Sequence, residues 1–174
     1  MLPKFRMSSY NSIGFHASYR GHVVDFSLRF TDNKTGHGDI ELRFAGQTWT
    51  CDSYYFVLDS GVMPDVESAG KVRAVLDKLL EQWLASVESM PDRGMAFLPY
   101  DFSDQYTAWL RCQRSGRDVW VERGWSHVEG WSFFPSAVGE LLRRLPDFQS
   151  DGPKIRVELT DFLEAIRTAR AAAI

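Results

Sequence analysis

The histidines are the first candidates for chemistry, because an imidazole titrates near neutral pH and binds metals. The chain has four, His16, His22, His37 and His127. A hairpin over residues 12–30 would set His16 opposite Asp25, either as an imidazole oriented by a carboxylate or as an ordinary cross-strand polar pair. His127 and Glu129 share one face of an expected strand, but a zinc site needs three or four converging ligands. Because the sequence has no HExxH or CxxC spacing, we expect no metal site.

Motifs for nucleophilic catalysis and phosphate binding are also missing. No serine lies in a G-x-S-x-G sequence, and Gly36-His37-Gly38 lacks the Lys-Ser or Lys-Thr that follows the glycines of a phosphate-binding loop. The neighbouring carboxylates Asp101 and Asp104 are explained equally well by a turn. We therefore expect no catalytic residues and no cofactor, and a protein that is not an enzyme.

The composition limits the class of protein. The chain has 174 residues, a net charge of -3 and a sequence pI near 5.8. This length suits one domain over residues 1–174, with a division into 1–90 and 95–174 as an alternative. The chain lacks the low hydrophobicity and high net charge of disordered proteins. It also has no apolar run of about 18 residues, so we expect no membrane partner.

Charge and cysteine usage give two further expectations. Basic residues are not clustered, which argues against a nucleic-acid partner. The N-terminal residues 1–6 are not followed by the apolar stretch of a secretory signal, so we expect a cytoplasmic protein. The two cysteines, Cys51 and Cys112, fall on apolar faces of expected strands, where reduced core thiols are typical.

Two hairpins and one long helix are expected in the first half. The first hairpin turns at Arg20-Gly21. It pairs Ala17 with Val24, Phe15 with Phe26, and Ile13 with Leu28. The second turns at Ala45-Gly46 and pairs Leu42 with Trp49 and Ile40 with Cys51. Residues 54–57 would extend this strand as a run buried on both sides. Further along, apolar residues at spacings of three and four predict a helix over 68–89, with Lys71 off its apolar stripe.

The second half repeats this plan loosely. The sequence predicts a strand over 95–100, which Pro99 makes either an edge strand or an irregular one. It also predicts a hairpin over 105–123 that turns at Ser115-Gly116. A turn at Arg123-Gly124 would lead to a strand over 125–134 with a bulge at Gly130. A short helix over 135–146, a strand over 155–159 and a final helix complete the chain. We expect an α+β fold, an antiparallel meander with helices packed on one face, and two loosely similar halves as an alternative.

Tryptophans are concentrated in the expected third hairpin and the residues just after it, where Trp109, Trp120, Trp125 and Trp131 fall within 23 residues. In its predicted register Trp109 lies opposite Glu122 and Arg111 opposite Trp120, on the face that does not carry Leu110 and Cys112. If helices cover only the latter face, the tryptophans with Arg111 and Glu122 form an exposed binding surface. If both faces are covered, the tryptophans belong to the core.

A second candidate surface is an acidic connector that includes Asp52, Asp59, Asp65 and Glu67. Such groups attract a basic partner, although solvated connectors have the same composition. The predicted partner-binding residues of the chain are Trp109, Arg111, Trp120, Glu122, Asp52 and Asp59.

In size, mild acidity, missing catalytic motifs and aromatic hairpins followed by helices, the chain resembles bacterial immunity proteins of polymorphic toxin or contact-dependent growth inhibition systems. The tracts 46–56 and 130–134 carry this resemblance. It implies a non-enzymatic protein that binds a toxin domain stoichiometrically and masks its active site. The alternative is a protein with a tryptophan-lined pocket, either an apolar-ligand binder or an enzyme, in which His16, Asp25 and His127 would converge.

Overall fold

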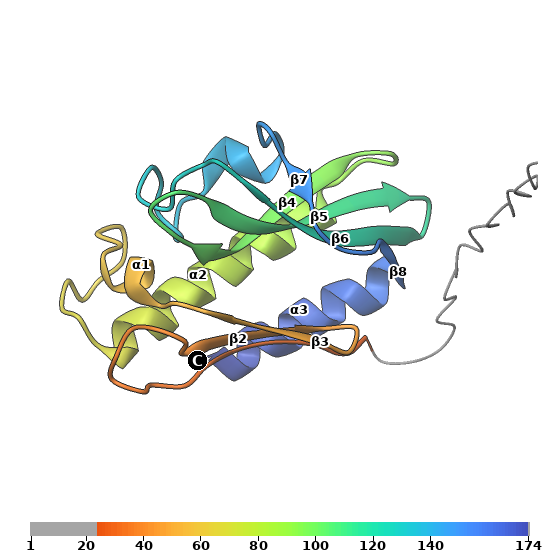
Figure 1. Ribbon diagram of the computed structural model, residues 1–174. Helices are drawn as coiled ribbons and strands as arrows, with labels where there is room; N and C mark the ends of the chain where they lie inside the picture. The colour runs from red at the N-terminus through yellow and green to blue at the C-terminus, as the bar shows by residue number, and fades with distance from the viewer. Residues whose placement is uncertain (1–23, 174) are drawn as a thin grey trace, which may run out of the picture.

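The structure is a computed structural model and describes residues 24–173 (Figure 1). Eight strands and four helical segments follow one another along this part of the chain. The strands are β1 (Phe26–Phe30), β2 (Ile40–Phe44), β3 (Gln47–Cys51), β4 (Met95–Phe102), β5 (Thr107–Ser115), β6 (Asp118–Ser126), β7 (Gln149–Ser150) and β8 (Ile155–Glu158). The helical segments are α1 (Tyr54–Val57), α2 (Ala69–Glu88), the 3-10 turn η1 (Gly139–Leu142) and α3 (Leu159–Ala173). The expected α+β fold with antiparallel sheets is confirmed.

The smaller sheet has the order β1-β2-β3. Its β2–β3 hairpin has the predicted register, with Leu42 opposite Trp49 and Ile40 opposite Cys51. The turn residues Ala45 and Gly46 both have positive φ, as the two-residue turn that suits the strand twist requires. The predicted first arm of the hairpin over 12–30 lies outside the described residues.

The chain leaves β3 in a helical turn, so the prediction that residues 54–57 continue the strand is wrong. The carboxylate of Asp39 accepts hydrogen bonds from the amide and the hydroxyl of Ser53, at 2.9 and 2.6 Å. Ser53 in turn caps the short helix α1 through its carbonyl, which accepts from the amide of Phe56. The α1 turn buries Tyr55 and Phe56 while Tyr54 stays exposed.

Helix α2 begins where the pattern predicts, because the side chain of Ser68 accepts a hydrogen bond from the amide of Lys71. Its apolar stripe is buried, including Trp83. Lys71 was expected off the stripe but is fully buried, and its ammonium donates to the carbonyl of Val62. Lys71 therefore attaches the preceding loop to the helix.

The larger sheet has the order β4-β5-β6-β7, with β8 also paired to β6. β4 is an edge strand, as Pro99 predicts, and its register shifts between Pro99 and Asp101. The β5–β6 turn uses Gly116, with positive φ, as its first central residue. The predicted turn lay one residue earlier, so the true register differs by two residues and the faces are unchanged.

Strand β6 continues through Gly124, where a turn was expected, up to Ser126. The glycine is needed because Phe148 and Gln149 pack directly against it. Residues 127–138 then form a loop instead of the expected strand, and the expected helix over 135–146 contains only the turn η1. β8 and α3 lie where the sequence predicts a strand and a final helix.

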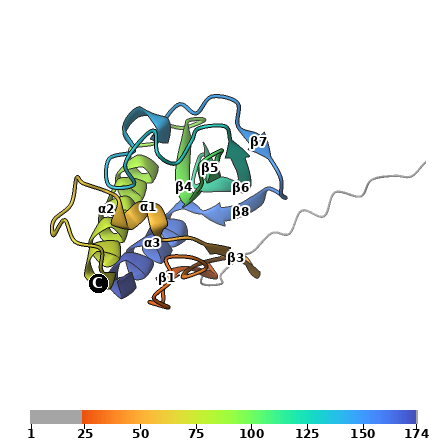
Figure 2. The same cartoon turned by 60° about the vertical axis from the view of Figure 1, so that its left-hand side comes forward.

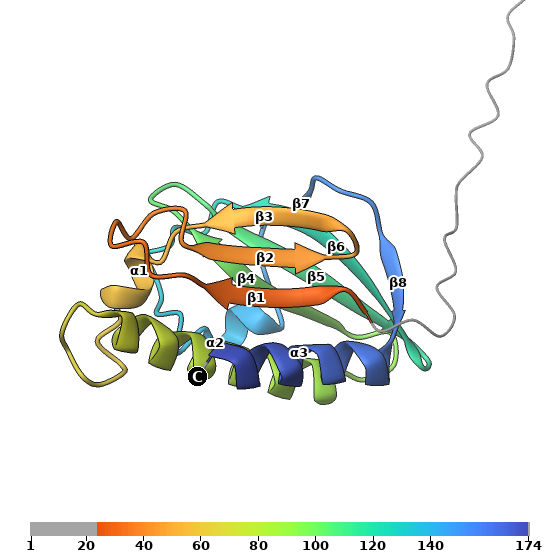
Figure 3. The same cartoon turned by 90° about the horizontal axis from the view of Figure 1, so that it is seen from below.

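Both long helices pack together and lie along the two sheets (Figures 2 and 3). α3 contacts β1 of the smaller sheet as well as β6 and β8 of the larger one, and α2 contacts β4. Rings from three elements meet in this core, since Phe26 contacts both Trp83 and Phe162. Among the described helices, none has the length and apolar character needed to cross a bilayer.

Gly124 provides a test of the packing outside the larger sheet. An added Cβ would lie 2.2 Å from the Gln149 carbonyl oxygen and 2.4 Å from the Phe148 ring. We expect Gly124→Ala to lower the free energy of unfolding by about 1–3 kcal/mol, because the added methyl group would push β6 away from Phe148 and Gln149. Urea denaturation measures this change. The control is Gly70→Ala in α2, which meets only the Ser68 hydroxyl at 3.7 Å and should be neutral or stabilising; equal stabilities of the two variants would contradict the packing.

Candidate functional site

The predicted tryptophan surface is covered by the chain itself. Trp109 is completely buried, and the ring of Phe133 stacks on it at 5.8 Å with an interplanar angle of 23°. Phe148 covers Phe97 on the same face, with ring centroids 5.8 Å apart. Of the two alternatives for Trp109, the exposed one is therefore wrong and the core one is confirmed, because the loop between β6 and β7 crosses the sheet face that a cover of helices alone would leave open.

Arg111 and Glu122 form an ion pair instead of a polar rim. They are direct cross-strand partners, and the Arg111 Nε lies 2.5 Å from the carboxylate of Glu122. Glu122 is 5% exposed and also accepts a hydrogen bond from Ser150 at 2.9 Å. Arg111 lies over the Phe148 ring, 4.6 Å from its centroid. This cluster holds the returning chain against β6.

Trp120 keeps part of its predicted exposure. It is half-buried, opposite Gln113 on β5 and Arg156 on β8. Of the four residues predicted on this face, Arg111 and Trp120 thus remain partly accessible, whereas Trp109 and Glu122 do not.

Asp59 is a buried structural carboxylate. It has no exposed surface and accepts hydrogen bonds from the amide of Gly61 at 2.8 Å and from the amide and hydroxyl of Ser136 at 2.7 and 2.9 Å. These bonds join the α1–α2 connector to the loop after β6. Asp59 was predicted to contact a partner, and its burial contradicts the exposure which that prediction assumed.

Asp52 remains partly exposed and is paired with a histidine. Its carboxylate lies 2.9 Å from the Nδ1 of His37 and accepts a bond from the amide of Gly38 at 2.7 Å. Burial of Asp52 opposes its ionisation, but these hydrogen bonds outweigh burial and lower the pKa of the carboxyl. The β1–β2 loop is thereby attached to the end of β3.

Three segments meet beside this pair at one end of the molecule, the left end in Figure 1. We call the surface formed by residues 52–67, 103–106 and 127–136 the end surface. Tyr55 donates a hydrogen bond to Asp104, and the amide of Gly130 donates to the carbonyl of Ser103 at 2.7 Å. Together with the Asp59–Ser136 bonds, these contacts hold the three segments side by side.

The end surface collects most of the exposed large apolar side chains. Of the eight such residues in the described part of the chain, seven belong to it and Met95 lies elsewhere. The seven are Tyr54, Leu58, Met63, Val66, Tyr106, Trp131 and Phe134. A concentration of this kind marks an interaction surface, whereas scattered apolar residues need no explanation.

The same segments have a one-sided charge. They contain no lysine or arginine. Their carboxylates are Asp52, Asp59, Asp65, Glu67, Asp104 and Glu129. The acidic connector of the sequence analysis supplies four of them; what the sequence did not reveal is that residues 103–106 and 127–136 join it. The only sign of this junction in the sequence is that residues 52–67, 103–106 and 127–136 all lack lysine and arginine.

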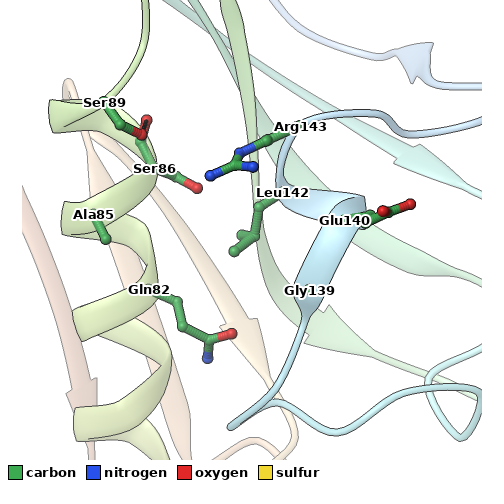
Figure 4. A pocket seen from close by; sticks show the side chains of 8 residues that line it. All are labelled: Gln82, Ala85, Ser86, Ser89, Gly139, Glu140, Leu142 and Arg143. Atoms are coloured by element: carbon green, nitrogen blue, oxygen red, sulfur yellow. Dashed lines mark hydrogen bonds between the residues drawn. The ribbon is translucent and has the colours of Figure 1, made fainter.

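The alternative of a tryptophan-lined pocket receives no support from these positions. An open cavity of about 350 Å³ lies between α2 and η1 and has no tryptophan in its wall (Figure 4). Asp25 contacts the β2–β3 turn at Gly46, whereas His127 pairs with Asp147 at 2.5 Å. His16 lies outside the described residues.

No metal or reactive thiol was identified within residues 24–173. This range contains no group of three or more His, Cys, Asp or Glu side chains able to hold a metal ion. Cys51 and Cys112 are free and buried. Burial raises the pKa of both thiols, which keeps them in the unreactive protonated form.

Comparisons with protein-family models, with curated proteins and with solved structures find no match to this chain.

The role of Asp59 can be tested by stability. We expect Asp59→Ala to lower the free energy of unfolding by about 1–3 kcal/mol, because buried donors of Gly61 and Ser136 lose their acceptor. The matched control is Asp65→Ala, an exposed carboxylate of the same connector, with an expected change within about 0.5 kcal/mol. Urea denaturation distinguishes the two variants. An Asp59→Ala variant with the stability of the unaltered chain would show that the Asp59 hydrogen bonds do not stabilise the fold.

The Tyr55–Asp104 contact predicts a pH dependence. Burial, and then the hydrogen bond to Asp104, raise the pKa of Tyr55 to about 12. A raised folded-state pKa stabilises the fold fully below the unfolded value and loses that effect as the pH rises through the folded value. We expect the free energy of unfolding to fall between about pH 10 and about pH 12, and to fall less in Tyr55→Phe. Parallel slopes for the two proteins in urea denaturation would refute this assignment.

Proposed function

We propose that this chain is a non-enzymatic binding protein that neutralises a protein partner in the cytoplasm by stoichiometric occlusion, as immunity proteins do, and that the end surface makes the contact. The observation that carries the proposal is the gathering of seven exposed apolar side chains on three mutually bonded segments. Aromatic residues such as Trp131 and Tyr106 are the types that dominate binding energy at protein interfaces.

The anchoring of the end surface supports the same function. Beneath the exposed side chains, Phe56, Phe102 and Phe133 form a continuous ring cluster with centroids 5.5 and 5.6 Å apart. Phe133 continues the cluster to Trp109. A surface that rests on packed rings loses little conformational entropy when a partner binds, which favours tight association.

The test is a calorimetric titration with each candidate toxin domain that is found encoded beside this chain. We expect a one-to-one complex that Trp131→Ala and Tyr54→Ala each weaken by about tenfold or more, since each removes an exposed aromatic side chain from the contact. Met95→Ala is the matched control, because Met95 is as exposed as Tyr54 but lies outside the end surface. Trp120→Ala is a second control, because Trp120 lies on the β5–β6 face where the sequence predicts partner binding.

Two results would contradict the proposal. The absence of a tight complex with any neighbouring toxin domain would remove the function. A complex weakened by Trp120→Ala or Met95→Ala, and unaffected by Trp131→Ala and Tyr54→Ala, would place the contact elsewhere.

A further inference from the structure

The ion pairs within the described part of the chain are distributed unevenly over its surface. Every Lys–carboxylate or Arg–carboxylate ion pair among the described residues lies outside the end surface, as in Arg170 with Asp77 and Arg156 with Asp118. Within the end surface, Asp65, Glu67 and Glu129 make no ion pair to any described residue. Exposed carboxylates without a cation attract a cationic partner.

The fold itself shows how an arginine is held when a cation is present. Arg111 pairs with Glu122 and lies over the Phe148 ring, 4.6 Å from its centroid. Arg123 pairs with Asp151 at 3.0 Å and lies over the Trp49 ring at 5.3 Å. In both cases a planar guanidinium is held between an aromatic face and a carboxylate, which a lysine ammonium matches poorly.

The end surface presents aromatic rings and carboxylates, and its segments supply no lysine or arginine. The imidazole of His37 stacks on Tyr54 and pairs with Asp52, and the buried ammonium of Lys71 donates to the carbonyl of Val62. Tyr54 meets Tyr55 edge-on at 5.4 Å, and Tyr55 is bonded to Asp104. Exposed Trp131 lies two residues after Glu129 on the same loop.

At the rim of the end surface, Trp125 contacts His127 at 4.9 Å, and His127 pairs with Asp147. At this position a histidine contacts both an aromatic ring and a carboxylate, while the segments that form the end surface supply no arginine.

We propose that the partner places arginine side chains against the exposed aromatic rings and unpaired carboxylates of the end surface, so that this surface recognises an arginine-bearing protein surface. This inference rests on the proposed function and names the chemistry of the partner. An uncharged apolar partner would desolvate Asp65, Glu67 and Glu129 without supplying a counter-charge, which opposes binding. A nucleic acid would be repelled by the same carboxylates.

The experiment measures the binding of an octa-arginine peptide to the 15N-labelled chain by NMR titration, with octa-lysine as the comparison. We expect amide shifts confined mainly to residues 52–67, 103–106 and 127–136, and several-fold tighter binding of octa-arginine than of octa-lysine. Shifts centred on other parts of the chain, equal affinities for the two peptides, or no binding would each overturn the inference.

Charge variants sharpen this test. Neutralising Asp65, Glu67 and Glu129 together, as D65N, E67Q and E129Q, should weaken octa-arginine binding about fivefold. The matched control neutralises three carboxylates that also lack an ion pair to any described residue but lie elsewhere, as E140Q, E158Q and D161N, and should change the affinity less than twofold. Equal effects of both triple variants would reduce the attraction to net charge alone and overturn the inference.

The outcome is separable from the proposed function. A stoichiometric complex with the toxin domain together with a failed peptide test refutes the arginine inference and leaves the function standing. A peptide that binds at the end surface when no protein complex forms supports the arginine-binding chemistry and refutes the function.

Discussion

The structure depends on covering the outer face of the five-stranded sheet. That face carries Trp109 and Phe97, which would otherwise be exposed, and α2 and α3 cover only the opposite face. The loop after β6 provides the cover by placing Phe133 on Trp109 and Phe148 on Phe97. At about 25 cal/mol per Å² of buried apolar surface, two such ring contacts contribute several kcal/mol, enough to fix the path of an irregular loop.

The path of this loop creates the end surface. After leaving β6 the chain places Phe133 on Trp109. Three residues later it reaches the α1–α2 connector, where Asp59 accepts two hydrogen bonds from Ser136. Residues 129–134 are then held near α1, and the exposed rings of Trp131 and Phe134 join the exposed side chains of Tyr54 and Leu58. The same segments carry carboxylates and no basic residue, so a surface produced by packing also acquires one sign of charge.

Local patterns predicted the elements that local forces determine. The β2–β3 register follows from its two-residue turn and one apolar face, and α2 follows from its cap and apolar stripe. The β5–β6 register was predicted two residues away because both Ser115-Gly116 and Gly116-Arg117 can form the turn and both keep the faces unmixed. The burial of Trp109 was not predictable in this way, since Phe133 lies 24 positions along the chain in an irregular loop without periodicity. The acidic connector was recognised, but its junction with residues 103–106 and 127–136 depends on tertiary bonds of Asp59 and Tyr55.

The central claim is that a partner covers the end surface and leaves the outer side of the β5–β6 hairpin free. Amide hydrogen exchange of this chain, alone and saturated with a protein partner that it binds stoichiometrically, tests the claim most directly. We predict slowed exchange in residues 52–67, 103–106 and 127–136, with residues 113–120 unchanged. Slowed exchange centred on residues 113–120, with the three segments unaffected, would contradict it.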